Sequence, residues 1–204
     1  MSPSDCIAAL ILAAGYSARM GAFKPLLPLG QATFLEEAAR RFRAAGVEDI
    51  RVVTGHRAEA LSPVLKKLGV REVFNPNYSR GMFASVRAGV QSLEPNVTAF
   101  FLLPVDIPLV SPRSLADLLQ AFRQRQARII YPCFQGLRGH PPLISSACVA
   151  NLPPDPPGGL RAYLSRYHDE ALNLEVQDEA VLLDCDTPEN YRRLQAYASR
   201  EELS

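Results

Sequence analysis

The sequence predicts an α/β fold with a Rossmann-like, doubly wound and mostly parallel sheet flanked by helices. Short apolar runs, bounded by glycine or proline, alternate along the chain with longer segments of helical periodicity. The 204 residues suit one domain with a full core, and no long linker or internal repeat divides them. We therefore expect residues 1–204 to form a single domain built from βαβ units.

Three predicted strands and two predicted helices occupy the first third of the chain. The strands are apolar runs at residues 7–12, 50–54 and 72–74, and a glycine stops the first. The first helix begins at a capping box whose first residue is Thr33. This helix ends at Gly46. The second helix runs from about 58 to 68, where Gly69 ends it.

The middle of the chain continues the alternation. A turn at residues 75–77 precedes a helix at about 82–93, whose apolar face holds Met82, Val86, Val90 and Leu93. Residues 99–103 are apolar throughout, which indicates a central strand. Ser111 as N-cap and Pro112 at the first helical position start a helix that extends to about 126.

The last third is less regular. Strands are expected at 129–132, 143–144, 172–176 and 181–184, with a Pro/Gly-rich loop at 153–159 and a helical stretch at 160–167. Thr187 and Pro188 open a final helix. Asn190 takes the third helical position, so a full capping box is not formed.

Composition narrows the class of protein. Hydrophobic residues make up 48% and charged residues 21%, which is ordinary for a globular protein. With a net charge of +1 and no apolar run long enough for a bilayer, we expect neither a nucleic-acid nor a membrane partner. No basic segment precedes the first apolar run, so we expect no signal peptide.

The cysteines indicate a reducing compartment. They are widely spaced and form no C-x-x-C pair: Cys6, Cys133, Cys148 and Cys185. Free thiols are therefore favoured over disulfides or a zinc site, and we expect a cytoplasmic protein.

Residues 12–24, directly after the first strand, have the composition of a triphosphate-binding loop. Gly15 and Gly21 permit sharp turns that bring N–H groups close to an anion. Arg19 supplies a planar fork of donors and Lys24 a point charge. The spacing is not that of a Walker A loop. An ordinary βα turn with solvated charges is the alternative.

A carboxylate at the end of the central strand predicts a metal site. Asp106 follows an apolar run, where a charge is costly unless it is hydrated, paired or bound to a metal. Mg²⁺ takes one or two carboxylates and completes its shell with water and substrate phosphates. The second ligand would be Asp184 or Asp186, which share one face if they lie on a strand. We prefer Asp186, although it could instead cap the last helix, and Asp106 could be a turn residue.

Two further segments are candidate binding elements. Gly81 and Ser85 lie at a predicted helix N-terminus, which can bind a base or a phosphate but is more often only a capped helix. Residues 136–142 form a glycine-rich turn that contains His140, and a lone histidine is often a packed or surface residue.

The loop at 12–24 resembles the signature L-A-A-G-x-S-x-R-M-G-x-x-K of the MobA-like nucleotidyltransferase family, particularly its molybdenum cofactor cytidylyltransferases. Other segments resemble family motifs in the same order. Residues 81–86 are similar to G-M-x-S-S-L, 106–108 to D-M-P, 139–141 to G-H-P, and 184–190 to D-x-D-T-P-E-D with Asn190 in the last place. Residues 158–161 resemble the G-A-R segment, although Pro156 and Pro157 replace its usual Gly-Asp.

The resemblance implies the nucleotide-diphospho-sugar transferase type of this fold and a Mg²⁺-dependent reaction. CMP would pass from CTP to a phosphate of molybdenum-molybdopterin, with release of pyrophosphate. The Ala13-Ala14-Gly15 form favours the cytidylyl branch over the guanylyl branch. The expected catalytic residues are Arg19, Lys24 and Asp106, and the expected metal ligands are Asp106 and Asp186. The expected nucleotide-binding residues are Leu12, Ala13, Ala14, Gly15, Lys24, Gly81 and Ser85. The expected acceptor-binding residues are Gly139, His140, Pro141 and Arg161.

Two other functions remain open from the sequence. The same loop would suit a nucleotidyltransferase that uses another NTP or a sugar- or polyol-phosphate acceptor. The chain could also be a non-catalytic nucleotide-binding partner of a molybdoenzyme. For a transferase, a client molybdoenzyme is a further partner that the resemblance allows.

Overall fold

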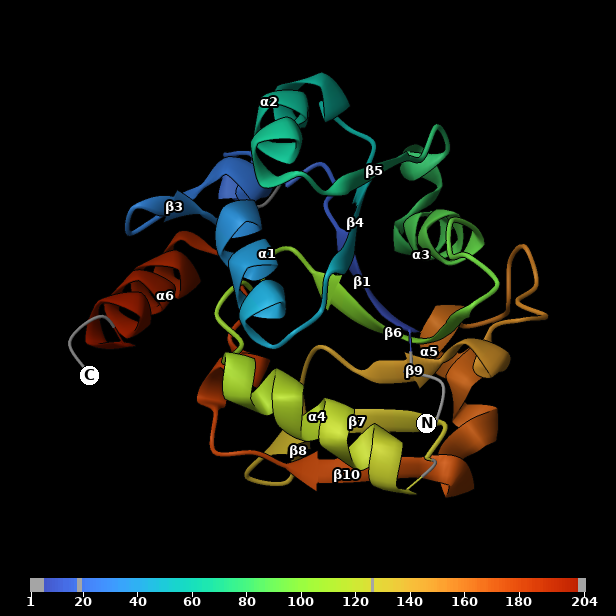
Figure 1. The fold of residues 1–204 in the computed structure, drawn as a ribbon. Coiled ribbons are helices and arrows are strands. Elements are labelled where there is room, and N and C mark those ends of the chain that lie inside the picture. The colour runs from blue at the N-terminus through green and yellow to red at the C-terminus, as the bar shows by residue number, and fades with distance from the viewer. Residues whose placement is uncertain (1–5, 18–19, 126, 202–204) are drawn as a thin grey trace.

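A computed structural model describes residues 6–17, 20–125 and 127–201 (Figure 1). Its strands are β1 Cys6–Leu12, β2 Pro28–Leu29, β3 Ala32–Thr33, β4 Asp49–Thr54, β5 Arg71–Phe74, β6 Val97–Pro104, β7 Ile129–Phe134, β8 Leu137–Arg138, β9 Leu143–Ser145 and β10 Ala171–Glu175. Its α-helices are α1 Phe34–Ala44, α2 Ala58–Leu68, α3 Met82–Gln91, α4 Pro112–Arg125, α5 Gly159–Leu164 and α6 Pro188–Glu201. Short 3₁₀ helices are η2 Lys24–Leu26, η3 Tyr78–Arg80, η4 Ser146–Cys148, η5 Ser165–Glu170 and η6 Glu179–Leu182.

One 8-stranded sheet organises the molecule, in the order β10-β7-β9-β6-β1-β4-β5 with β8 beside β7. β1 pairs in parallel with both β4 and β6, and β10 pairs in parallel with β7. β9 is antiparallel to its neighbours β6 and β7. The predicted mostly parallel sheet is therefore confirmed, with β9 as an antiparallel insertion beside the central strands.

Helices cover both faces of this sheet, as Figure 1 shows. The larger apolar cluster joins residues of α1, α2, α4 and α6 to one face, and the smaller joins α3 and α5 to the other. Alternate residues of β1 enter the two clusters: Ile7, Ala9 and Ile11 the first, and Ala8, Leu10 and Leu12 the second. Because both faces of β1 are buried, its sequence is a continuous apolar run. The doubly wound prediction is confirmed.

The prediction of a strand at 181–184 is wrong, because residues 179–182 form η6. The Asp178 side chain accepts a hydrogen bond from Ala180 N and so starts a turn. The Val181 carbonyl accepts from His140 N rather than joining a strand ladder. The helical stretch predicted at 160–167 is two elements, α5 followed by η5.

The hairpin of β7 and β8 was not predicted. Gln135 and Gly136 turn it with φ of 50° and 76°, and a left-handed glutamine gives no turn signal in the sequence. Met82, expected on the apolar face of α3, is instead 69% exposed.

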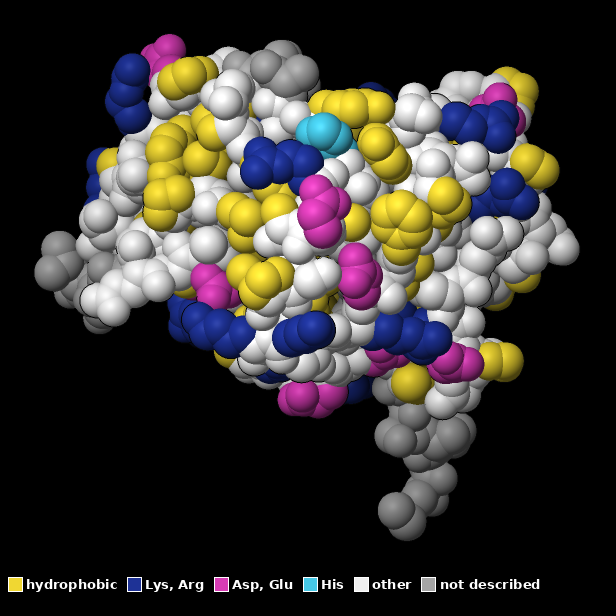
Figure 2. Space-filling model, turned by 90° about the horizontal axis from the view of Figure 1, so that it is seen from above, with side chains coloured by type: hydrophobic (Ala, Val, Ile, Leu, Met, Phe, Trp, Pro, Cys, Tyr) yellow, Lys and Arg dark blue, Asp and Glu magenta, His cyan; other side chains and the backbone are white. Residues whose placement is uncertain are grey.

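The charged surface is mixed, as the small net charge leads one to expect, and the cysteines are free, as predicted. Lys and Arg side chains are interspersed with Asp and Glu on the face shown in Figure 2. All four cysteines are free, and three of them are buried. Across the described ranges, no helix combines the length and apolar character needed to cross a bilayer.

Asp178 joins three segments near the end of the chain. Its carboxylate, on a residue only 4% exposed, accepts hydrogen bonds from Ser111 N at 2.8 Å and Ser114 Oγ at 2.9 Å. It also accepts from Ala180 N at 3.0 Å and from the Tyr197 hydroxyl at 3.4 Å. One buried charge therefore holds the start of α4, the start of η6 and the middle of α6 together.

We predict that Asp178→Ala lowers the free energy of unfolding by about 3 kcal/mol, because several buried donors lose a charged acceptor. Urea denaturation followed by circular dichroism measures this change. Asp117→Ala, at an exposed position of α4, is the control and should change stability by less than about 0.5 kcal/mol. Equal stability of the two variants would show that Asp178 does not hold these segments.

Candidate active site

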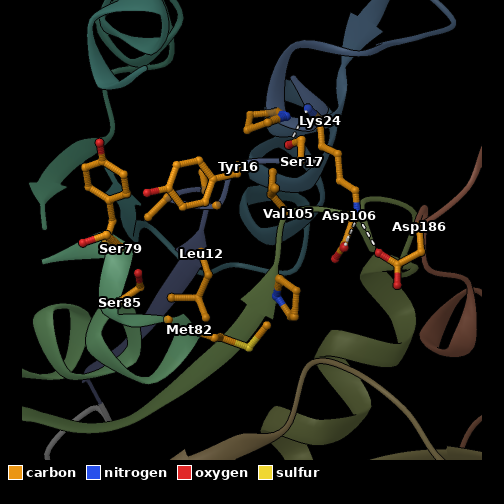
Figure 3. Close-up of a pocket in the computed structure, with 17 residues that line it drawn as sticks. Leu12, Tyr16, Ser17, Lys24, Ser79, Met82, Ser85, Val105, Asp106 and Asp186 are labelled. Atoms are coloured by element: carbon orange, nitrogen blue, oxygen red, sulfur yellow. Dashed lines mark hydrogen bonds and ion pairs between the residues drawn. The ribbon is translucent and has the colours of Figure 1, made fainter. Parts of the chain in front are cut away.

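A cavity of about 500 Å³ opens where β1 and β6 end (Figure 3). Val105 N donates to the carbonyl of Leu12 at 3.1 Å, so the segments that leave the two strands stay adjacent. Ligands of open α/β sheets bind at this edge of the sheet. The cavity lining includes nine of the predicted residues: Leu12, Ala13, Ala14, Gly15, Lys24, Gly81, Ser85, Asp106 and Asp186.

Lys24 is the centre of the charged side of the cavity. Its Nζ lies 2.8 Å from Asp106 Oδ2 and 2.7 Å from Asp186 Oδ1, and Figure 3 shows both contacts as dashed lines. Its side chain is only 11% exposed. Burial alone lowers the pKa of Lys24, but the hydrogen bonds and charges of Asp106 and Asp186 outweigh burial and raise it above its usual value. The ammonium therefore stays charged at neutral pH.

The backbone around Lys24 is fixed by local contacts. Lys24 N donates to Ser17 Oγ at 3.1 Å, which closes the loop between the two residues. Pro25 stands at the start of η2, where its missing N–H costs no helical hydrogen bond. Arg19, predicted to bind phosphate from this loop, lies outside the described residues, so its role stays a prediction.

The structure distinguishes Asp186 from Asp184. Asp186 lines the cavity and contacts Lys24, whereas Asp184 is exposed and accepts from Asn190 Nδ2 at 2.9 Å. The expectation that both share one face fails because they do not lie on a strand. Thr187, not Asp186, caps α6, since its Oγ1 accepts from Asn190 N at 3.2 Å.

The opposite side of the cavity contains uncharged polar groups. Ser85 is 5% exposed, and its Oγ accepts from Asn75 Nδ2 at 3.1 Å. A serine hydroxyl can donate one hydrogen bond as well as accept, and Ser85 lines the cavity. Asn75 was predicted only as part of a turn, and no sequence pattern indicated that it supports Ser85.

Aromatic rings form a wall of the cavity that the sequence did not reveal. Tyr16 and Tyr78 line it with ring centroids 5.6 Å apart, and His56 lies 4.9 Å from Tyr16. Gly55 permits this packing, because a Cβ there would stand 2.5 Å from the Cβ of Tyr78. The rings come from three segments, which follow β1, β4 and β5, so no sequence spacing links them.

The predicted acceptor residues are not among the residues that line the cavity. Gly139 is buried against Val181, whose carbonyl oxygen would lie 2.4 Å from an added Cβ. Pro141 is buried after a cis peptide bond, and Arg161 is exposed on α5. Acceptor binding by these residues stays a prediction, and close packing is sufficient to explain why position 139 is glycine.

His140 is a mostly buried histidine near the carboxylates. Within the described ranges, its Nδ1 has no hydrogen-bond partner. Burial lowers the pKa of His140, although the carbonyl of Leu102 and the charges of Asp106 and Asp184 act in the opposite direction. The imidazole is therefore neutral at pH 7.

We predict that His140 makes the protein less stable below pH 6.5. Because its pKa is lower in the folded state, the unfolded chain binds more protons as the pH falls below about 6.5, and folding loses stability there. His140→Gln should reduce the difference in unfolding free energy between pH 7.5 and pH 5.5, as measured by urea denaturation. An unchanged difference would show that this histidine does not contribute.

A family model for the MobA-like NTP transferase domain matches residues 9–172 of this chain. The chain belongs to this family.

Three curated relatives align along nearly their whole length. The molybdenum cofactor cytidylyltransferase of Escherichia coli is 30% identical, over 94% of this chain and 95% of the relative. The nicotine blue oxidoreductase of Paenarthrobacter nicotinovorans is 29% identical, over 93% and 96%. The molybdenum cofactor guanylyltransferase of Xanthomonas euvesicatoria is 28% identical, over 91% and 92%.

Solved structures share the fold of this MobA-like chain. A nucleotidyl transferase from Methanothermobacter thermautotrophicus superposes with a TM-score of 0.83 at 24% identity, over 97% of this chain and 100% of that one. Rv0371c of Mycobacterium tuberculosis, in a complex with manganese, has a TM-score of 0.72 at 25% identity, over 95% and 100%. The family and these neighbours identify the chain as a nucleotidyltransferase with the nucleotide-diphospho-sugar transferase fold.

Proposed function

We propose that this nucleotidyltransferase moves CMP from CTP to a phosphate of molybdenum-molybdopterin. The observation that supports this reaction most directly is the convergence of Lys24, Asp106 and Asp186 in the cavity beside the first loop. These groups come from segments that are 82 and 162 residues apart, so only the fold brings them together. The 30% identical cytidylyltransferase and the Ala13-Ala14-Gly15 sequence support cytidine as the base.

In the proposed complex the triphosphate lies over the loop at 12–17, whose residues line the cavity together with Lys24. Arg19 would add a second cation. A phosphate oxygen of the acceptor attacks the α-phosphorus, the bond from that phosphorus to the bridging oxygen breaks, and pyrophosphate leaves. Positioning and neutralisation of phosphate charge account for such catalysis without a covalent protein nucleophile.

The carboxylates suit Mg²⁺. Asp106 and Asp186 each place an oxygen within 3 Å of the Lys24 ammonium, so the two carboxylates converge on one point. Their side chains are 22% and 27% exposed, so water can reach them. Within the described ranges no group of three or more His, Cys, Asp or Glu side chains could hold a metal. Two carboxylates with access to water fit Mg²⁺, a hard ion. It binds one or two carboxylates and takes phosphates and water as its other ligands. When bound, Mg²⁺ would neutralise charge on the phosphates.

The remaining surroundings support the rest of the proposal. Ser85 and the backbone at Gly81 line the uncharged side of the cavity, where the nucleoside would lie. Gly139, His140, Pro141 and Arg161 are proposed to bind the acceptor. Four free thiols support a cytoplasmic location, where a client molybdoenzyme would receive the product.

The first test is a turnover assay with Mg²⁺, loaded molybdenum-molybdopterin and each of the four NTPs. We expect pyrophosphate release to be fastest with CTP. Faster release with GTP would contradict the cytidine assignment but leave the transferase reaction intact. Absence of turnover with every NTP would contradict the proposed reaction.

We predict that Asp106→Asn and Lys24→Met each lower kcat/KM for CTP by about 10²-fold or more, because each removes charge that faces the phosphates. Lys67→Met is the matched control, since Lys67 also contacts a carboxylate, Glu36 at 2.8 Å, but is 75% exposed and is not among the residues that line the cavity. An unchanged kcat/KM in both variants would contradict the catalytic roles of Asp106 and Lys24.

A further inference from the structure

The Lys24 ammonium lies between the carboxylates of Asp106 and Asp186 and contacts both. A metal ion bound by both carboxylates would need the same position. Its two contacts, 2.8 Å and 2.7 Å, have the lengths of strong charge-assisted hydrogen bonds. Figure 3 shows the lysine side chain extending toward the two aspartates, away from the part of the cavity lined by Leu12 and Ser85. The lysine therefore compensates the negative charge of the two predicted metal ligands.

A divalent ion on the same oxygens would lie close to this ammonium. Mg²⁺ binds oxygen at about 2.1 Å. An ammonium 2.8 Å from the Asp106 oxygen would then be at most about 5 Å from the ion. Two cations at that separation repel strongly at a site where the lysine is 11% exposed, because burial reduces screening by solvent. Metal binding is therefore opposed until Lys24 has another anionic partner.

The triphosphate is such a partner. Lys24 and the loop residues 12–17 line one cavity, so a phosphate bound there can accept hydrogen bonds from the ammonium. The Asp106 oxygen that contacted the lysine is then available to the ion, which gains phosphate oxygens as additional ligands. Two ligands that each favour the same rearrangement must strengthen each other's binding.

We propose that Lys24 is a displaceable stand-in for the divalent ion, so that the ion enters the site only together with the nucleotide. This inference rests on the proposed function, because it takes a nucleoside triphosphate as the ligand that displaces the lysine. It adds an order to binding: the nucleotide-free protein binds the metal weakly, and the lysine charge is the cause.

The test measures Mn²⁺ binding by the nucleotide-free protein, with free Mn²⁺ detected by electron paramagnetic resonance. Lys24→Met should bind Mn²⁺ more tightly than the wild type, by about 5-fold to 150-fold, the usual range of coupling between sites. Lys67→Met, which removes an equal charge from an ion pair that does not line the cavity, should bind like the wild type. Circular dichroism confirms that each variant is folded.

A second variant locates the ion. Adding Asp106→Asn to Lys24→Met should abolish the gain in Mn²⁺ affinity, because one of the two carboxylate ligands is lost. Mn²⁺ should also raise the Tm of Lys24→Met more than that of the wild type, since a ligand that binds the folded state stabilises it. If Lys24→Met does not fold, Lys24→Gln is assessed by the same measurements.

Equal or weaker Mn²⁺ binding by a folded Lys24 variant would overturn the proposal, as would a gain that survives Asp106→Asn. Neither measurement uses turnover, so the two failures are distinguishable. A protein that transfers no nucleotide would refute the proposed function and leave the Mn²⁺ titrations valid. An active enzyme without the affinity gain would refute only the role of Lys24 as a stand-in.

Discussion

The contact of one ammonium with two carboxylates is the interaction on which the site depends. The ammonium of Lys24 and the carboxylates of Asp106 and Asp186 share a partly buried space. Burial of any one of these charges without the others would cost free energy. Together they compensate one another, which explains why a lysine with 11% side-chain exposure keeps its charge. The same contact joins the first loop, the end of the central strand and the segment before the last helix.

The sheet supplies the precision of this contact. β1 lies between β4 and β6, and the parallel pairing of β1 with β6 brings Leu12 opposite Pro104. Each strand then continues into a segment that carries one charged partner, Lys24 or Asp106. The third partner, Asp186, is held beside Asp106 by the main chain. Cys185 N donates to the carbonyl of Asp106 at 3.0 Å, so the segment that carries Asp186 is attached to the end of β6.

The sequence predicted most of the fold and part of the candidate site. Apolar runs predicted the central strands because these are buried on both faces. The motifs named Lys24, Asp106 and Asp186 as candidates, and the structure brings these three together in one cavity, whereas their roles stay predictions. It failed at 181–184, where the side chain of Asp178 competes with a strand ladder for the backbone. It also could not find the ring cluster of Tyr16, His56 and Tyr78, because contact between segments that are far apart in the sequence leaves no periodic pattern.

The position of Asp186 makes the charged cluster depend on the end of the chain. Lys24 and Asp106 follow β1 and β6, whereas Asp186 lies between η6 and α6. The main-chain hydrogen bond from Cys185 N to the Asp106 carbonyl attaches this late segment to the edge of the sheet. A substitution that loosens the segment would therefore withdraw one carboxylate from the lysine, even if it replaced no residue that lines the cavity.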